Sequence, residues 1–283
     1  FIEPWMINDF LMMPIPSIRG RDNFFRVFGG ISRCIPGLVL MCYLGLPSPV
    51  DACGLLEPPS GFEEVFWVHL DEDCSAAERR ELAVAGTDVV TALEQGRSVD
   101  FIGVVVTGDV VLSRLPSRRV EDLPTLPAQV REELSQRRSE TIRFIPGYIR
   151  IRGSQFENVL ATNLSEGALL ILGDIDLTDV VFVQSVDLSK AIFVQPATFR
   201  GMRVDFEGFF IGATFMQSAD FYQELIGTHS RFHKAVFEAP VNFSEVRFKG
   251  VAEFLEVTFR DAADFSQAVF ESGTGFSGSV FQG

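Results

Sequence analysis

The sequence predicts an all-β fold, a four-sided β-solenoid with a small helical cap at its N-terminal end. Two observations predict it. Over residues 171–281, large apolar residues recur at alternating steps of six and five residues without a break. A small or β-branched residue usually stands two positions earlier, as Ala213 does before Phe215. Because residues two apart on a strand share a face, each such pair marks one short inward-facing strand.

We call these twenty-one large residues the ladder, and sixteen of them are phenylalanine. The ladder consists of Ile171, Leu177, Phe182, Leu188, Phe193, Phe199, Val204, Phe210, Phe215, Phe221, Ile226, Phe232, Phe237, Phe243, Phe248, Phe254, Phe259, Phe265, Phe270, Phe276 and Phe281. Its phenylalanines from Phe199 onward are the predicted structural core. Four strands per coil give a 22-residue repeat, which places Phe210, Phe232, Phe254 and Phe276 in one column. A three-sided coil would not produce such uniform columns.

Two other repeat folds are excluded. A leucine-rich horseshoe needs a different leucine spacing and an asparagine ladder, and neither is present. An amphipathic helix needs apolar residues at i, i+3 and i+4, which steps of five and six do not supply.

Residues 1–52 are interpreted as upstream residues followed by a signal peptide. Arg19, Arg21, Arg26 and Arg33 precede an apolar run at 35–46, and small residues stand before Cys53. This order is typical of export signals, and the run is too short to span a membrane. A buried hydrophobic segment is the alternative.

Export would place Cys53 and Cys74 in an oxidising compartment, so we predict a disulfide between them. A competing interpretation makes Cys53 a lipid-modified anchor.

Residues 53–97 are predicted to form the cap. A strand at 64–70 precedes a helix that begins at Ser75, where Glu78 completes a capping box. The helix ends at Gly96, with a kink or break at Gly86, and is expected to cover the open end of the coils.

Residues 98–170 are predicted to form irregular first coils. Phe101, Val106 and Leu112 already follow the spacing of five and six. A charged helical segment at 128–138 interrupts the coils and is expected to be a surface excursion. Residues 171–283 form the regular solenoid. No capping segment follows Phe281, so we expect the repeat to continue beyond Gly283 or a partner to cover this end.

The units around Phe215, Phe221 and Phe265 resemble the pentapeptide repeat family, whose unit has a small residue two positions before a central Leu or Phe. The resemblance implies a right-handed quadrilateral β-helix. Met202, Gly208 and Glu224 depart from the pattern. A charged Glu224 should not face the core, so we expect an outward bulge or distorted edge at 221–230.

No catalytic, cofactor-binding or metal-binding motif is predicted. His229 and His233 flank Phe232 and are expected to face outward rather than to ligate a metal. The Ser and Asp residues beside the ladder are expected to serve turn hydrogen bonds. The net charge of −14 disfavours direct nucleic-acid binding.

The predicted function is therefore that of a non-enzymatic, exported scaffold whose flat faces bind another protein or an envelope macromolecule. The family resemblance implies one alternative, an acidic protein that mimics DNA and protects DNA gyrase. The acidity fits this alternative, but an export signal opposes it because gyrase is cytoplasmic. The third hypothesis is an accessory repeat domain of a larger membrane-associated protein.

Overall fold

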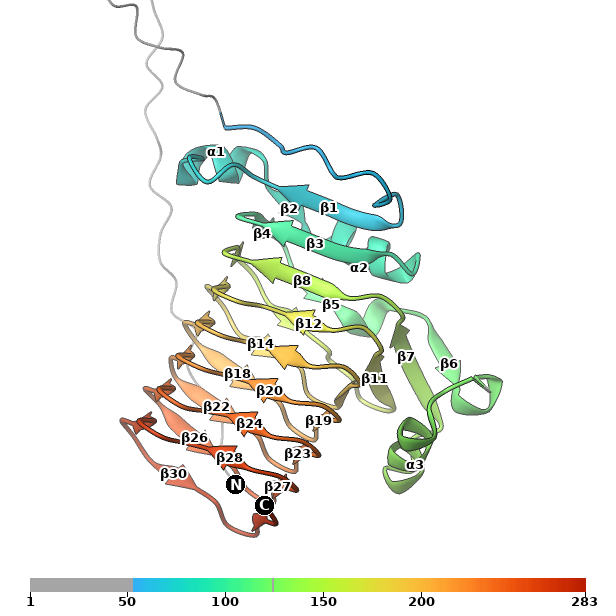
Figure 1. The fold of residues 1–283 in the computed structure, drawn as a ribbon, viewed down its shortest axis with the longest axis vertical. Helices are drawn as coiled ribbons and strands as arrows, with labels where there is room; N and C mark the ends of the chain where they lie inside the picture. The colour runs from blue at the N-terminus through green and yellow to red at the C-terminus, as the bar shows by residue number, and fades with distance from the viewer. Residues whose placement is uncertain (1–52, 124) are drawn as a thin grey trace, which may run out of the picture. The chain divides into compact units, whose positions relative to one another are not determined.

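The computed structural model describes residues 53–123 and 125–283, so the predicted export signal lies outside the described residues. The described chain forms a β-solenoid in which each coil contributes one strand to each of four sheets (Figure 1). Neighbouring strands are parallel throughout, apart from the antiparallel pair β6–β7. The predicted four-sided solenoid is thereby confirmed.

Sheet I contains β1 (Val65–His69), β3 (Ser98–Ile102), β8 (Ile149–Arg152), β12 (Ile175–Asp176), β16 (Ala197–Thr198), β20 (Ala219–Asp220), β24 (Val241–Asn242) and β28 (Ala263–Asp264). Sheet II contains β2 (Val84–Ala85), β4 (Val105–Thr107), β9 (Gln155–Phe156), β13 (Val181–Phe182), β17 (Arg203–Val204), β21 (Leu225–Ile226), β25 (Arg247–Phe248) and β29 (Val269–Phe270).

Sheet III contains β5 (Val110–Val111), β10 (Leu160–Ala161), β14 (Val186–Asp187), β18 (Glu207–Phe209), β22 (His229–Arg231), β26 (Val251–Glu253) and β30 (Thr274–Gly275). Sheet IV contains β6 (Ser117–Arg119), β7 (Thr141–Ile145), β11 (Ala168–Ile171), β15 (Ala191–Phe193), β19 (Thr214–Phe215), β23 (Val236–Phe237), β27 (Thr258–Phe259) and β31 (Val280–Phe281). The helices are α1 (Ala76–Glu81), α2 (Gly86–Glu94) and α3 (Ala128–Gln136), with 3-10 turns η1 (Leu112–Arg114) and η2 (Val120–Asp122).

Two of the four corners of each regular coil contain a left-handed residue. The residue two positions after each ladder residue of sheets I and III has a positive φ, and these residues recur every eleven positions. They are Asp179, Lys190, Gly201, Gly212, Gln223, Lys234, Glu245, Glu256, Gln267 and Gly278. The left-handed residue turns the chain within the shorter, five-residue steps, which leave sheets I and III. The six-residue steps leave sheets II and IV.

The core consists of phenylalanine columns that meet inside the coils. Rings within a column stack face to face, with 5.0 Å between the centroids of Phe210 and Phe232 and 4.9 Å between those of Phe232 and Phe254. Rings of neighbouring columns meet edge to face, as Phe210 and Phe221 do at 90°. Both arrangements are favourable for aromatic quadrupoles, so phenylalanine packs well both along a column and between neighbouring columns.

Ten of the fourteen phenylalanines predicted for the core are fully buried, from Phe199 to Phe259 along the ladder. The other four lie in the last coil, where Phe265, Phe270 and Phe276 are partly buried and Phe281 is 53% exposed. Within the described chain no further coil stacks on this one. The assignment of Phe281 to the core is therefore wrong in this structure.

Asp and Asn residues beside the ladder of sheet I terminate its strands. Asp176, Asp220, Asn242 and Asp264 each accept a hydrogen bond from the amide two residues later. The bond from the Ser266 amide lowers the pKa of Asp264 below its usual value. These contacts confirm the expectation that such residues serve turn hydrogen bonds.

Glu224 does not bulge outward, and the distorted edge expected at 221–230 is wrong. Its side chain is 1% exposed, and β21 pairs regularly with β17 and β25 on either side. The 22-residue register places it between Met202 and Val246 in the interior. Burial raises the pKa of its carboxyl well above 4.5, so the interior favours the uncharged form.

The N-terminal cap differs from the single kinked helix that the sequence predicts. The capping box between Ser75 and Glu78 is present, but α1 and α2 are separated by β2, which pairs with β4. At Gly86 a Cβ atom would lie 2.7 Å from the Gly108 carbonyl oxygen. Only glycine allows this close approach. Helix α2 buries Val89 and its neighbours against the first coils.

A groove beside helix α3 as the candidate functional site

Helix α3 packs on the outer face of sheet IV and creates a second, smaller core. Val130 and Leu134 of the helix are fully buried against Leu170 and Ile192, which point outward from β11 and β15. The sequence predicts an exposed charged excursion here, and that prediction missed the two buried helix residues. Figure 1 shows α3 on the side of the solenoid where β7 and β11 lie.

Three side chains attach the C-terminal end of α3 to the solenoid. Arg137 Nε donates to Glu133 Oε1 at 2.6 Å. Thr214 Oγ1, on the outer face of β19, donates to the same Glu133 oxygen at 2.6 Å and accepts a bond from Arg137. Thr214 is fully buried. Because charge-assisted hydrogen bonds are strong when shielded from water, this triad fixes the helix over the coils.

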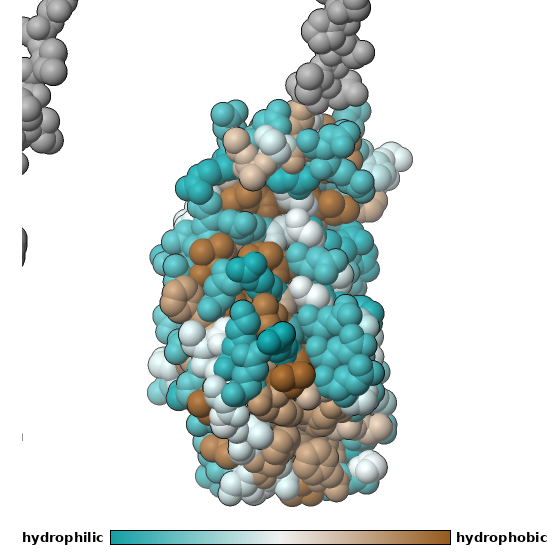
Figure 2. Space-filling model, turned by 90° about the vertical axis from the view of Figure 1, so that its left-hand side faces the viewer, coloured by the Kyte–Doolittle hydropathy of each residue, from teal (hydrophilic) through white to brown (hydrophobic). Residues whose placement is uncertain are grey.

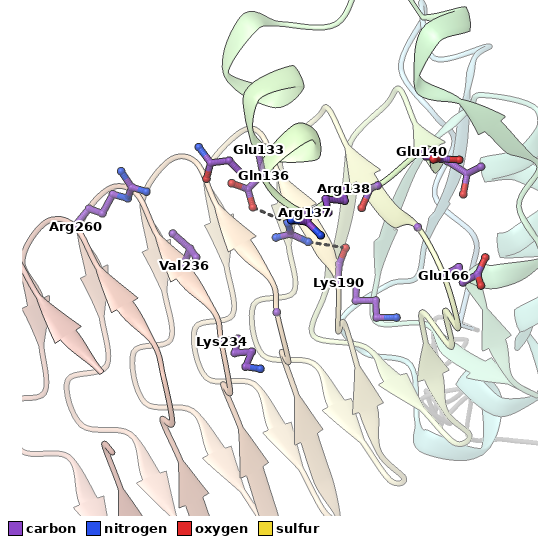
Figure 3. A pocket seen from close by; sticks show the side chains of 14 residues that line it. Glu133, Gln136, Arg137, Arg138, Glu140, Glu166, Lys190, Lys234, Val236 and Arg260 are labelled. Carbon is purple, nitrogen blue, oxygen red and sulfur yellow. Dashed lines mark hydrogen bonds and ion pairs between the residues drawn. The ribbon is translucent and has the colours of Figure 1, made fainter. Parts of the chain in front are cut away.

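The groove lies between this helix end and the corner that joins sheets III and IV, and has a volume of about 660 Å3. Its charged lining consists of Arg137, Arg138, Lys190, Lys234 and Arg260 against Glu133, Glu140 and Glu166. Figure 3 shows these side chains spread along several coils rather than around one point. Five cations against three carboxylates make the groove positive on a chain of net charge −14.

Lys190, Gly212 and Lys234 occupy the same left-handed corner position in three successive coils, with φ values of 61°, 61° and 59°. A Cβ atom at Gly212 would meet nothing within 4 Å. Since coils stack about 4.8 Å apart, the two lysines flank an open gap of about 10 Å between their backbones. Lys190 Nζ donates to the carbonyl oxygens of Leu164 and Ser165. Lys234 Nζ lies 3.7 Å from the Glu256 carboxylate.

The groove continues along α3 into a second hollow of about 290 Å3, where the balance of charge reverses. Glu132, Glu133 and Glu238 line it, with Arg260 as its cation. Arg260 Nε lies 3.2 Å from Glu238 Oε1. Met216 supplies an apolar surface. The two hollows therefore form one channel that is basic at one end and acidic at the other.

The comparisons with known proteins match the C-terminal coils. A family model described as pentapeptide repeats (9 copies) matches residues 232–280. Residues 232–280 carry pentapeptide repeats. No curated protein and no solved structure gives a match.

The groove joins the pentapeptide repeats to an insertion that they do not contain. Lys234, Val236 and Arg260 lie within the matched repeats, whereas Arg137 and Arg138 come from the α3 segment. No residue of this groove was predicted from the sequence to be functional. One signal was available, because Leu170 and Ile192 are apolar at outward positions where the regular two-residue strands of sheet I carry Asp, Asn or Thr.

The cysteines and histidines discussed from the sequence lie elsewhere. Cys53 and Cys74 form the predicted disulfide. His229 Nε2 lies 3.3 Å from Glu253, and His233 Nε2 lies 3.4 Å from Glu256, so the histidines have different partners. Over residues 53–123 and 125–283, no group of three or more His, Cys, Asp or Glu side chains is placed to hold a metal. Over the same ranges, no helix has the length and apolar character needed to cross a membrane.

The side of the solenoid that faces away from α3 is different in character. Figure 2 shows hydrophilic and apolar residues interspersed over most of its length, with apolar residues gathered on the lowest, C-terminal coils. Those coils include the exposed Val280 and Phe281. The α3 side therefore differs from this one, because there the inserted helix forms a groove against the coils.

Proposed function

We propose that this pentapeptide-repeat protein is an exported, non-enzymatic scaffold that binds a partner macromolecule in the groove beside α3. The observation that carries the proposal is the α3 insertion itself. Regular coils present flat faces, whereas the inserted segment builds a concave channel with its own small core. Ordering such a segment costs conformational entropy, and the resulting channel gives a partner more contact area than a flat face would.

The arrangement of charges supports binding rather than catalysis. The ionisable groups of the groove are distributed over successive coils, and Glu133 and Arg137 are occupied in holding α3 in place. A reacting centre needs groups that converge within hydrogen-bond reach of one atom. A distributed row of charges is instead suited to an extended ligand.

The Cys53–Cys74 disulfide supports export, since such bonds persist mainly in oxidising compartments. Fractionation of the native cells tests this part of the proposal. We expect a mature chain outside the cytoplasm that lacks residues 1–52. Cytoplasmic recovery with residues 13–52 intact would contradict export and favour a cytoplasmic DNA mimic that protects DNA gyrase. Firm association with membranes would favour a lipid anchor at Cys53 or a larger membrane-associated protein.

Site-specific photocrosslinking tests the groove. A photoreactive amino acid replaces Gln136, which lines both hollows, and in a control replaces Ser266, which is exposed on sheet I. We expect one crosslinked partner from Gln136 and none from Ser266, with a weaker crosslink when Thr214→Val loosens the end of α3. Equal crosslinking from both positions would contradict a dedicated groove.

A further inference from the structure

We infer that the occupant of the groove is an extended peptide segment with separated charges, acidic where it meets Lys190 and Lys234 and neutral or basic where it meets Glu132 and Glu238. This inference rests on the proposed function, because it assigns the chemistry of the ligand to the same groove. Nothing in the family match specifies such a ligand. The assignment comes from three features of the channel.

The first feature is the basic end of the channel. Arg138 and Lys234 are exposed, and Lys190 uses its ammonium to bridge two backbone carbonyls at the rim. They surround the open gap at Gly212. On a strongly acidic protein, a local excess of cations attracts an anion that the remaining surface repels. Carboxylates of a peptide would enter between the two lysines.

The second feature is the acidic end, which excludes a uniform polyanion. A sulfated or phosphorylated chain that filled the basic end would have to run past Glu132 and Glu238. Like charges placed side by side weaken a complex substantially. A chain whose charge changes along its length meets favourable contacts at both ends.

The third feature is the set of apolar and amide side chains between the two ends of the channel. Val236 and Met216 offer apolar contacts, and Gln129 and Gln136 carry amide groups that can donate to and accept from a peptide backbone. From the coil of Lys190 to that of Arg260 is three coils, or about 14 Å along the axis. An extended peptide advances about 3.3 Å per residue, so about five residues span the channel.

Fluorescence anisotropy with short labelled peptides tests the inference on the full chain. The main probe has glutamates at one end, two leucines in the middle and lysines at the other end. A second probe has the same composition with alternating charges, a third is all acidic, and heparin serves as the polyanion. We expect the charge-separated peptide to bind about tenfold more tightly than the others, with affinity falling as salt is added.

Charge-reversal variants locate the binding. Arg138→Glu combined with Lys234→Glu should weaken the charge-separated peptide about tenfold. Glutamate fits the corner position of Lys234, because Glu256 occupies the equivalent position one coil later with a φ of 56°. The matched control combines Arg118→Glu with Lys249→Glu, two exposed cations outside the groove, and changes the net charge equally. The control should leave the affinity within about twofold.

A third variant tests the acidic end. Glu132→Lys should weaken the charge-separated peptide and strengthen the all-acidic one. Tighter binding of heparin or of the all-acidic peptide to the unmodified chain would overturn the inference, as would equal effects of the groove and control variants. Absence of peptide binding together with a retained Gln136 crosslink would overturn this inference alone. Loss of both would overturn the proposed function as well.

Discussion

Glu224→Met should stabilise the protein, and the gain should grow with pH. The carboxyl is buried in the interior, and neither of its oxygens has a hydrogen-bond partner. Methionine is the residue one coil earlier in the same column, Met202, so the replacement fits the coil geometry. The substitution removes a buried polar group and replaces it with an apolar side chain of similar length.

The magnitude has two parts. At low pH the carboxyl is protonated in both states, and the gain is the cost of burying an unpaired polar group, about 1–3 kcal/mol. Burial raises the folded-state pKa of Glu224 above 4.5, so the folded chain binds this proton more tightly than the unfolded chain does. The stability that this tighter proton binding gives the unmodified protein is therefore fully present below the unfolded pKa of Glu224 and is lost as pH rises toward its folded pKa. Over that window the unmodified protein loses about 1.4 kcal/mol per pH unit relative to the variant.

Urea unfolding followed by circular dichroism at pH 4, 5, 6 and 7 measures this difference, provided that the m-value is unchanged. Glu94→Met, at an exposed position at the end of α2, is the matched control and should show neither the gain nor its rise with pH. A difference that is constant with pH, or that shrinks as pH rises, would refute the assignment of a buried, protonated Glu224.

Three further perturbations test the core, the cap and the α3 attachment. Phe254→Ala should lower the free energy of unfolding by about 3–5 kcal/mol, because its ring is fully buried between stacked neighbours. Phe206→Ala, at a half-exposed position, should cost little. Equal losses of stability for the two variants in thermal melts would contradict the stacked core. Cys74→Ser should lower the free energy of unfolding by about 3 kcal/mol, the chain-entropy value for a loop with a sequence separation of 21, and a reducing agent should affect only the unmodified chain. Thr214→Val should cost about 1–3 kcal/mol by leaving Glu133 and Arg137 with an unmet hydrogen bond, and should raise amide hydrogen exchange in α3 while the coils stay protected. Uniform exchange across the chain would show that α3 is not attached there.

The coils were predictable because their determinants are local and repeated. Each ladder residue and the residue two before it form one short strand, and a 22-residue period places equal residues in register. A signal that recurs at every coil can be recognised without knowing any long-range contact. The disulfide was also predictable, since two cysteines remain after the predicted cut before Cys53.

The failures lie where an interaction between distant segments overrides the local pattern. Glu224 has a charge in its free form, so the sequence suggested an outward turn. The surrounding coils instead fix the strand, and the side chain lies in the interior, where burial favours its neutral form. The groove was missed because it depends on α3 packing against strands that follow it in the sequence, through contacts such as Glu133 to Thr214. The charged and polar residues of α3 indicate which side of the helix faces solvent, but they do not indicate what its buried side packs against.

The left-handed corner residues have a consequence for how this protein can change. Between Asp179 and Gly278 they include Asp, Lys, Gln, Glu and Gly, although the ladder beside them keeps to large apolar residues. Their side chains lie at the outer edge of the prism, outside the phenylalanine columns. In each repeat the residues that determine the fold and the residues that determine the surface therefore occupy separate positions. The corner residues form two rows along the solenoid, and successive residues of one row lie about 4.8 Å apart. Substitutions in these rows can change the surface one coil at a time while the core of the solenoid stays the same.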